Sequence, residues 1–432
     1  MFDYKKSRFL VDIPISNGHE DLLAVYHTLT QALFLIPAAQ WADLEKTTWK
    51  EDPETIWQLS SQGVLIKTEV DETALFNQWR DRHVHDFSLM RSKVLVTRKC
   101  NNRCTYCIIE PQAVEMGTET AREMDSFYIE QIKSFRPLQV KDDYLGGEPL
   151  LNTDVVFESA SRRCFYCRGK GLEYAFTITT NGTLLTRAII TKLKAVGLNG
   201  IRVSMAGPAD VHDTLRPFRG GGGTYERIMQ NMLRISGMIP ISIECQYDAG
   251  SDDYQRMPEM MDDLLRRGIE VSEITFTPIL ARRRANSYCA GMGDVEKIVF
   301  LYRKSARRGY QAHTKAPCNT CMADFRSIFV FDADGSLIPC PSLQCGEMAI
   351  GDVRSGIDFV SECQILQRPL PEKCLIQCEL LPVCMGGCRL QALTRNGNFN
   401  GVDCHYQTYR PLLEEYIYCA AVGLPEEQMQ SA

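Results

Sequence analysis

The sequence predicts an α/β protein whose centre is a partial, TIM-like barrel of six βα units, flanked by a small N-terminal α+β module and a loop-rich C-terminal region. Three observations predict this fold. Strand and helix patterns alternate over residues 92–280, which is typical of parallel βα units. There are about six strand signals, whereas a complete barrel needs eight. Ten of the 18 cysteines lie between Cys318 and Cys404, so this region needs an organisation of its own.

Residues 1–88 are expected to form the N-terminal module, which contains no cysteine. Short strands are predicted at 9–14 and within 22–36, with a polar turn at His27–Thr28. Helical pieces over 41–63 precede a strand at 64–70, and a helix over 73–87 leads onward. The pattern alone leaves two interpretations open, a structural flap on the barrel or a recognition module.

Residues 89–312 are expected to form the barrel. Its strands are predicted at 93–97, 142–146, 174–180, 201–205, 241–247 and 273–279. The second of these is more charged than a strand buried on both faces should be. Residues 313–432 form the third region, with one hairpin turn at Asp334-Gly335 and a final helix.

Composition and charge narrow the class of protein. The net charge of −6 gives no general attraction to nucleic acid or to membrane surfaces. The chain starts without an apolar signal segment and contains no apolar run long enough to span a membrane, so a cytoplasmic location is expected. Disulfides are not expected there. Eighteen cysteines therefore indicate metal or cluster ligation.

Three cysteines stand in one loop directly after the first predicted barrel strand. They are Cys100, Cys104 and Cys107. Barrel enzymes place their chemistry in loops at the carboxyl ends of the strands. Three thiolates can hold three irons of a 4Fe-4S cluster and leave the fourth iron open to an outside ligand. The alternative is a structural zinc knuckle that shares a distant fourth ligand.

The spacing Cys100-x3-Cys104-x2-Cys107, with Tyr106 before the last cysteine, resembles the signature of the radical S-adenosylmethionine (SAM) family. Further elements resemble the family's GGEP, TNGT, S-x-D-G-P…H-D…R and G-T-aromatic-x-R patterns. They are Gly146–Pro149, Thr180–Thr183, Ser204–Pro208 with His212, Asp213 and Arg216, and Gly223–Arg227. One departure is Ala206, where the family has Asp.

The resemblance implies a SAM site beside the cluster. It implies that Glu148 accepts from the SAM ammonium group and that Ser204 and Arg227 hold the SAM carboxylate, with Arg216 as the rival arginine. The cofactor-binding residues expected in this way are Tyr106, Gly146, Gly147, Glu148, Asn181, Ser204, Arg216, Arg227 and Glu244.

The cysteine-dense region resembles the SPASM extension found in part of that family, although the gap between Cys374 and Cys378 is one residue longer here. The resemblance implies two auxiliary 4Fe-4S clusters. Cluster I would be held by Cys318, Cys321, Cys340 and Cys388, and cluster II by Cys374, Cys378, Cys384 and Cys404. Two zinc sites are the alternative, and Cys345 or Cys363 could replace Cys318.

SPASM-bearing relatives mostly modify peptides or proteins. The resemblance therefore implies a maturase that uses a 5′-deoxyadenosyl radical to form a thioether or carbon–carbon crosslink within a ribosomally made peptide. It also implies a flavodoxin or ferredoxin as electron donor and a leader-binding role for the N-terminal module. Glu244 and Tyr247 resemble a strand of such maturases.

Two alternatives stay open. The first is another protein oxidation, such as formylglycine formation or the crosslinking of an enzyme subunit. Pro341 argues against formylglycine formation, because those relatives place an Asp after the cysteine that matches Cys340. The second is a non-catalytic iron–sulfur or zinc scaffold.

Overall fold

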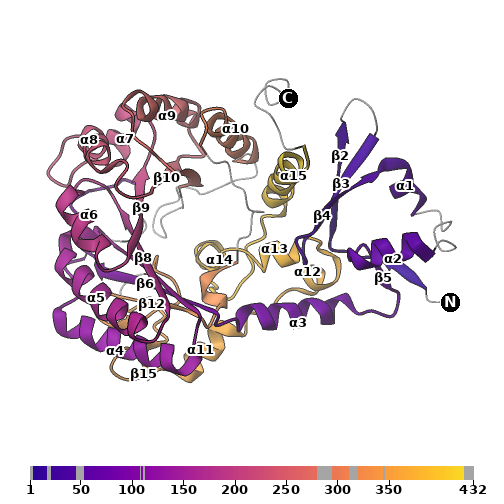
Figure 1. Ribbon diagram of the computed structural model, residues 1–432, viewed down its shortest axis with the longest axis horizontal. Coiled ribbons are helices and arrows are strands. Elements are labelled where there is room, and N and C mark those ends of the chain that lie inside the picture. Colours follow the sequence, from indigo (N-terminus) through magenta and orange to yellow (C-terminus); the bar gives the residue numbers. More distant parts are fainter. Residues whose placement is uncertain are drawn as a thin grey trace.

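The computed structural model describes residues 3–16, 21–44, 53–107, 109, 112–279, 294–310, 320–343 and 346–422. Figure 1 shows the barrel and its outer helices on the left and the N-terminal module on the right. Segments from the C-terminal region lie between them, and helix α15 of that region packs on the N-terminal module beside the barrel.

Six parallel strands form the barrel sheet and follow one another in sequence order. They are β6 (Leu89–Thr97), β7 (Gln139–Gly146), β8 (Glu173–Thr180), β9 (Leu198–Met205), β10 (Ile241–Tyr247) and β11 (Glu273–Pro278). Each coincides with a strand predicted from the sequence. The prediction of a partial, TIM-like barrel is confirmed.

Helices cover the outer face of this sheet, as Figure 1 shows. They are α4 (Thr118–Phe135), η2 (Pro149–Asn152), α5 (Thr153–Gly169), α6 (Arg187–Lys194), α7 (Ala209–Leu215), α8 (Tyr225–Ile235), η3 (Asp253–Arg256), α9 (Met257–Arg266) and α10 (Asp294–Ala306). On α8 the buried residues Ile228, Met229, Met232 and Ile235 follow the helical period and join the core behind the sheet. None of the described helices is both long enough and apolar enough to cross a membrane.

The strands alternate between an apolar outer face and a polar inner face. On β10, Ile243 and Cys245 are fully buried in the core under the helices. Glu244 and Gln246 point to the opposite side, into the barrel, and are partly exposed. This inner face is where a barrel of this kind can hold ligands.

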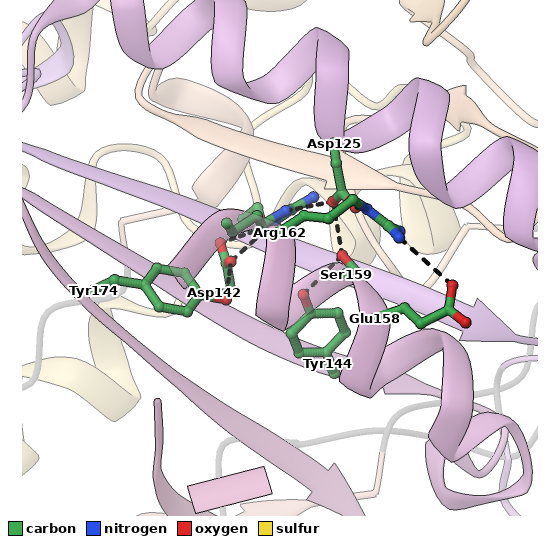
Figure 2. A network of polar contacts seen from close by, with 9 residues as sticks. Asp125, Asp142, Tyr144, Glu158, Ser159, Arg162 and Tyr174 are labelled. Atoms are coloured by element: carbon green, nitrogen blue, oxygen red, sulfur yellow. Dashed lines mark hydrogen bonds and ion pairs between the residues drawn. The ribbon is translucent and has the colours of Figure 1, made fainter. Parts of the chain in front are cut away.

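Paired charges account for the unusual polarity of β7. Asp142 on the outer face forms an ion pair with Arg163 of α5, with 3.0 Å between Oδ2 and Nη1. Arg163 Nε also lies 2.7 Å from Asp125 Oδ1 of α4, and all three residues are buried. Figure 2 shows Asp142 and Asp125 within one network with Tyr174 and Ser159. On the inner face, Asp143 pairs with Lys93 at 2.8 Å.

The C-terminal region extends the barrel sheet. β12 (Ile328–Phe331) pairs in parallel with β6. The hairpin predicted at Asp334-Gly335 is present, with Gly335 at φ +97°, and leads into β13 (Ser336–Leu337). The remaining elements are η4 (Met322–Asp324), β14 (Gly351–Asp352), β15 (Gly356–Ile357), α11 (Phe359–Leu366), α12 (Glu372–Gln377), α13 (Leu381–Cys384), α14 (Arg389–Asn396) and α15 (Tyr406–Val422).

The N-terminal module contains a three-stranded antiparallel sheet in the order β2-β3-β4. Its elements are β1 (Tyr4–Lys6), β2 (Leu10–Ser16), β3 (Asp21–His27), β4 (Leu33–Pro37), α1 (Ala38–Asp43), α2 (Pro53–Ser61), β5 (Leu65–Lys67) and α3 (Glu72–Val84). One face of this sheet packs on the C-terminal helix α15, where Val11 and Tyr26 are buried together with Leu413 and Ile417. Asp71 caps α3 by accepting from the amides of Thr73 and Ala74.

Candidate functional site

The three-cysteine loop, residues 98–107, lies at the carboxyl end of β6. Two of its backbone amides donate hydrogen bonds to the end of α7 and to the segment that follows it. Arg103 N donates to Pro217 O and Thr105 N donates to Leu215 O, each at 2.9 Å. A second segment far along the chain therefore fixes the backbone of the cysteine loop.

The thiols of this loop lie in one another's electrostatic range. Burial first, and then the negative charges of Glu148, Cys104 and Cys107, together raise the pKa of Cys100 to about 11. The Asn102 amide donates to Cys100 Sγ at 3.4 Å, and Asn181 Nδ2 lies 3.9 Å from the same sulfur. Three thiols with amide donors around them are a ligand set that suits an iron–sulfur cluster.

Within the part of the chain that the structure describes, no three His, Cys, Asp or Glu side chains lie close enough together to hold one metal ion. A single ion needs its ligands that close together. In a cubane each thiolate binds a different iron atom, so the cluster ligands stand farther apart than the ligands of one ion.

Two glycines let the end of β7 approach the cysteine loop. Gly147 N donates to Thr97 O and Glu148 N donates to Lys99 O, both at 2.9 Å. A Cβ atom on Gly147 would stand 2.2 Å from Lys99 O, and one on Gly146 would stand 2.1 Å from Thr97 O. The glycines at these positions are therefore required by the backbone of the cysteine loop itself.

Replacing Gly147 with alanine is expected to displace this loop. Because the added Cβ would overlap the Lys99 carbonyl, SAM cleavage by the reconstituted protein should fall by about 100-fold. Gly169→Ala is the matched control, since a Cβ atom added at that position would meet no heavy atom within 4 Å. Anaerobic reconstitution followed by quantification of 5′-deoxyadenosine measures both. Equal activity of the two variants would contradict the interpretation.

Glu148 ties the GGEP turn to the TNGT turn. Its carboxylate is fully buried and accepts from Leu150 N at 3.0 Å, Thr180 Oγ1 at 2.7 Å and Asn181 N at 2.8 Å. Burial raises the pKa of this carboxyl group, and the three donors act in the opposite direction. Three protein donors thus already bind the group expected to receive the SAM ammonium.

Asn181 extends this connection to the cysteine loop. Its Nδ2 donates to Asn101 Oδ1 at 2.8 Å, and its Oδ1 accepts from Thr183 Oγ1 at 2.7 Å. Asn101 Nδ2 in turn donates to Thr183 Oγ1 at 2.8 Å. The TNGT turn therefore orients the loop that carries Cys100.

Arg216 is the arginine that the structure brings to the cysteine loop. It is buried, and its Nη1 donates to Tyr106 Oη at 2.6 Å and to Gln246 Oε1 at 2.9 Å. Its Nε is buried and has no hydrogen-bond partner among the described residues. A buried N–H of this kind is a donor ready for an anionic ligand.

The His-Asp pair upstream of Arg216 has a positioning role. His212 Nδ1 accepts from Ala206 N at 3.2 Å, and its Nε2 lies 3.0 Å from Thr224 Oγ1. Asp213 Oδ1 accepts from the Thr224 and Tyr225 amides at the start of α8. The pair joins the turn after β9 to α8 and so fixes the segment that ends at Arg216.

Arg227 lies elsewhere. It is exposed on α8, whose buried side packs on the outer face of the sheet. Ser204 and Glu244 are cross-strand partners on the inner face of β9 and β10, and both are partly exposed. Of the two arginines predicted for SAM, Arg216 is therefore the one that the structure brings to the cysteines.

The cysteines of the C-terminal region gather in two groups. In the first, burial and then the charges of Cys321 and Cys388 together raise the pKa of Cys340 to about 12. In the second, burial and then the charges of Cys378 and Cys404 together raise the pKa of Cys384 to about 12. Burial and the charge of Cys404 also raise the pKa of Cys374. Within each set that the SPASM resemblance implies, the described cysteines thus lie within electrostatic range of one another, and their binding of two clusters stays a prediction.

Cys289, Cys318 and Cys345 lie outside the described residues. Cys363 on α11 and Cys419 on α15 are partly exposed. Cys164, Cys167 and Cys245 are buried in helix α5 and strand β10, away from either group. Such thiols behave as small apolar residues.

Arg98 links the two cysteine regions. Its Nε donates to Asp332 Oδ1 at 2.8 Å and its Nη2 donates to Leu343 O at 3.0 Å. Both side chains of this ion pair are fully buried. The residue that opens the cysteine loop is thereby fixed to the hairpin that precedes Cys340.

Sequence reasoning did not single out Arg98, Asn101 or Gln246. Gln246 could have been found, because it stands two residues after Glu244 in a strand and so shares its inward face. Arg98 and Asp332 are 234 positions apart, and no local pattern connects them.

Fold and site together define a class of protein. Its members have a partial βα barrel that carries a three-cysteine loop at the carboxyl end of the first strand. Residues 94–247 match the model of the Radical SAM superfamily, so this part of the chain is a radical SAM domain. The chain is 31% identical to Fe-coproporphyrin III synthase of Methanosarcina barkeri over 153 residues. That match spans 35% of either protein, about a third of the relative's length.

A longer match relates the chain to PqqA peptide cyclase of Ruegeria pomeroyi, at 26% identity over 71% of this chain and 84% of the relative. Two solved structures share the fold. Native anSMEcpe with bound AdoMet and Cp18Cys peptide has a TM-score of 0.62 at 18% identity, covering 77% of this chain and 97% of that one. SuiB of Streptococcus suis bound to precursor peptide SuiA has a TM-score of 0.54 at 13% identity, covering 93% and 99%.

Proposed function

We propose that this chain is a radical SAM maturase of a ribosomally made peptide. When bound, the 4Fe-4S cluster and SAM would supply a 5′-deoxyadenosyl radical that takes a hydrogen atom from an unactivated carbon of the substrate. The observation that carries the proposal is the three-cysteine loop, which Asn101 and Asn181 orient and beside which Arg216 keeps a buried, unpartnered Nε.

The residues of this chain would have the following roles in binding the cluster and SAM. Cys100, Cys104 and Cys107 would hold the cluster, and Arg216 would receive the SAM carboxylate. Ser204 and Glu244 would face the ligand from the inner side of β9 and β10. Contact of Glu148 with the SAM ammonium stays a prediction, as does a SAM contact of Arg227.

A peptide substrate is supported by the long match to a peptide cyclase and by two neighbours of the same fold that hold peptides. An intramolecular thioether or carbon–carbon crosslink is the product we propose. Two auxiliary clusters would then take up the electron released on product formation or relay electrons from a flavodoxin or ferredoxin. The two cysteine groups of the C-terminal region support their presence.

Anaerobic reconstitution tests the proposal against a non-catalytic iron–sulfur or zinc scaffold. About twelve irons per chain and release of 5′-deoxyadenosine on reduction with SAM are expected. Bound zinc without SAM cleavage would contradict the proposal. Co-expression with a short neighbouring reading frame then tests the substrate, since each crosslink removes two hydrogen atoms from the peptide mass. A gain in peptide mass, or a loss of water from the peptide, would indicate a different reaction.

The choice between Arg216 and Arg227 can be tested by SAM binding. Arg216→Lys keeps the charge but loses the fork of donors, so SAM should bind about 10- to 100-fold more weakly to the reconstituted protein. Arg227→Lys, on the exposed face of α8, should bind SAM as the wild type does. Equilibrium binding under anaerobic conditions measures both. The reverse order would restore Arg227 as the carboxylate ligand.

For the N-terminal module we propose leader-peptide recognition. The antiparallel sheet β2-β3-β4 has β4 at one edge, where an added strand could pair. Leu35 on β4 is a large apolar side chain that is 48% exposed, as a docking edge requires. Protection of β4 amides from hydrogen exchange when a precursor peptide is added would support this role.

A further inference from the structure

Basic side chains lie on the inner face of the barrel sheet, towards the amino-terminal ends of β6 and β7 and in the middle of β9. Arg91 and Lys141 are register partners on β6 and β7, and Arg202 lies on β9. We call these three residues the basic rim. All three are exposed and line one cavity of about 770 Å³. This volume is in the range of ligand sites, about 300–1,000 Å³.

The charges inside this cavity do not cancel. Asp142 is paired with Arg163, and Asp143 is paired with Lys93. Burial lowers the pKa of His83, so its ring is neutral at pH 7. Arg91, Lys141 and Arg202 form no ion pair with another described residue. Besides Asp142 and Asp143, one more carboxylate among the described residues lines the cavity, that of Asp86. The cavity therefore carries excess positive charge within a chain of net charge −6.

A polar surface leads from the basic rim towards the cysteine loop. Beside the rim, Thr177 and Thr179 donate to Asp143 at 3.2 Å and 3.1 Å, and Thr179 is the register partner of Arg202. Farther along the same inner face lies Glu244, and then Gln246, which accepts from Tyr106 of the cysteine loop at 2.6 Å. A chain that enters at the rim would thus pass along hydrogen-bonding side chains towards the SAM site.

We propose that this cavity binds an acidic segment of the peptide substrate, with Asp or Glu side chains of that segment against the basic rim. The inference rests on the proposed function and adds the class of substrate. The volume of the cavity admits a few residues of an extended peptide. The net negative charge of the rest of the chain repels an extended polyanion such as a nucleic acid, so charge complementarity is confined to the cavity.

Binding of two labelled model peptides tests the proposal with the full-length, reconstituted protein. Fluorescein-labelled hexaglutamate should bind, and hexalysine should not, as measured by fluorescence anisotropy under anaerobic conditions. Raising the salt concentration should weaken hexaglutamate binding. The variant R91Q/K141Q/R202Q should bind hexaglutamate about tenfold more weakly or worse, since three charge contacts are lost. Lys170→Gln, exposed at the end of α5, is the matched control.

A charge reversal excludes misfolding as the cause of a loss. The variant R91E/K141E/R202E should gain affinity for hexalysine, which an unfolded barrel would not do selectively. Equal binding of hexaglutamate by wild type and R91Q/K141Q/R202Q would overturn the proposal. Equal competition by a single-stranded oligonucleotide of the same charge would overturn the peptide assignment.

Release of 5′-deoxyadenosine without peptide separates this proposal from the proposed function. None of the three residues of the basic rim is among those expected to hold the cluster or SAM, so all these variants should still release 5′-deoxyadenosine. Normal cleavage with no rim-dependent peptide binding would overturn the acidic-segment proposal alone. Absence of cleavage in every protein, wild type included, would overturn the proposed function.

Discussion

Replacing Cys104 with alanine is expected to abolish SAM cleavage while the absorption of the two auxiliary clusters persists. Cys104 lies between the other two thiols of the cysteine loop, so its loss leaves two thiolates for a cluster that needs three. Bound iron should fall by about a third, from about twelve atoms to about eight. Iron analysis, visible absorption and 5′-deoxyadenosine release measure the three quantities.

Cys164→Ala is the matched control for this variant. Cys164 is buried in α5, distant from the cysteine groups, and should be replaceable without loss of iron or activity. If the Cys104 variant lost all cluster absorption, the three clusters would not be independent. If it kept SAM cleavage, the cysteine loop would not be the SAM-binding cluster site.

Replacing Arg163 with methionine is expected to destabilise the barrel by about 3–5 kcal/mol. Arg163 is fully buried between Asp125 and Asp142, and Figure 2 shows both carboxylates in its network. Without the guanidinium group, the buried carboxylate of Asp142 loses its ion-pair partner, and Asp125 keeps only its pair with Arg162. Equilibrium urea unfolding followed by circular dichroism measures the loss.

Two further variants make this test specific. Arg168→Met removes an exposed arginine in the last turn of the same helix and should change stability by roughly 0.5 kcal/mol or less. The variant R163M/D125N/D142N removes all three charges and should regain part of the stability. A loss below roughly 1 kcal/mol in the Arg163 variant alone would mean that water reaches the network and screens it.

The sequence was sufficient to predict the barrel because each strand and helix carries its own local pattern. The strand at 241–247, for example, alternates buried and inward residues over its whole length. The three thiols of the cysteine loop were also predictable, since their spacing is local. The strand β12 was predicted as part of the hairpin at Asp334-Gly335. Its parallel pairing with β6 was not predicted, because pairing of distant segments leaves no short-range signal.

Side-chain partners were harder to predict than elements. The charges of β7 were an anomaly in the sequence, and only the positions of Arg163 and Lys93 in the fold explain them. The choice between Arg216 and Arg227 depends on where each residue lies in the fold, because Arg216 is buried directly after α7 and Arg227 is exposed on α8. Both follow similar sequence patterns, and the three-dimensional path after β9 separates them.

The packing of the N-terminal sheet on α15 has a consequence for biosynthesis. Val11 and Tyr26 are buried against Leu413 and Ile417, almost 400 positions later in the chain. The ribosome releases the first segment long before it makes the last helix, so this apolar face waits uncovered while the barrel folds. A chain truncated before α15 would expose that face permanently, and aggregation rather than inactivity would be its first defect.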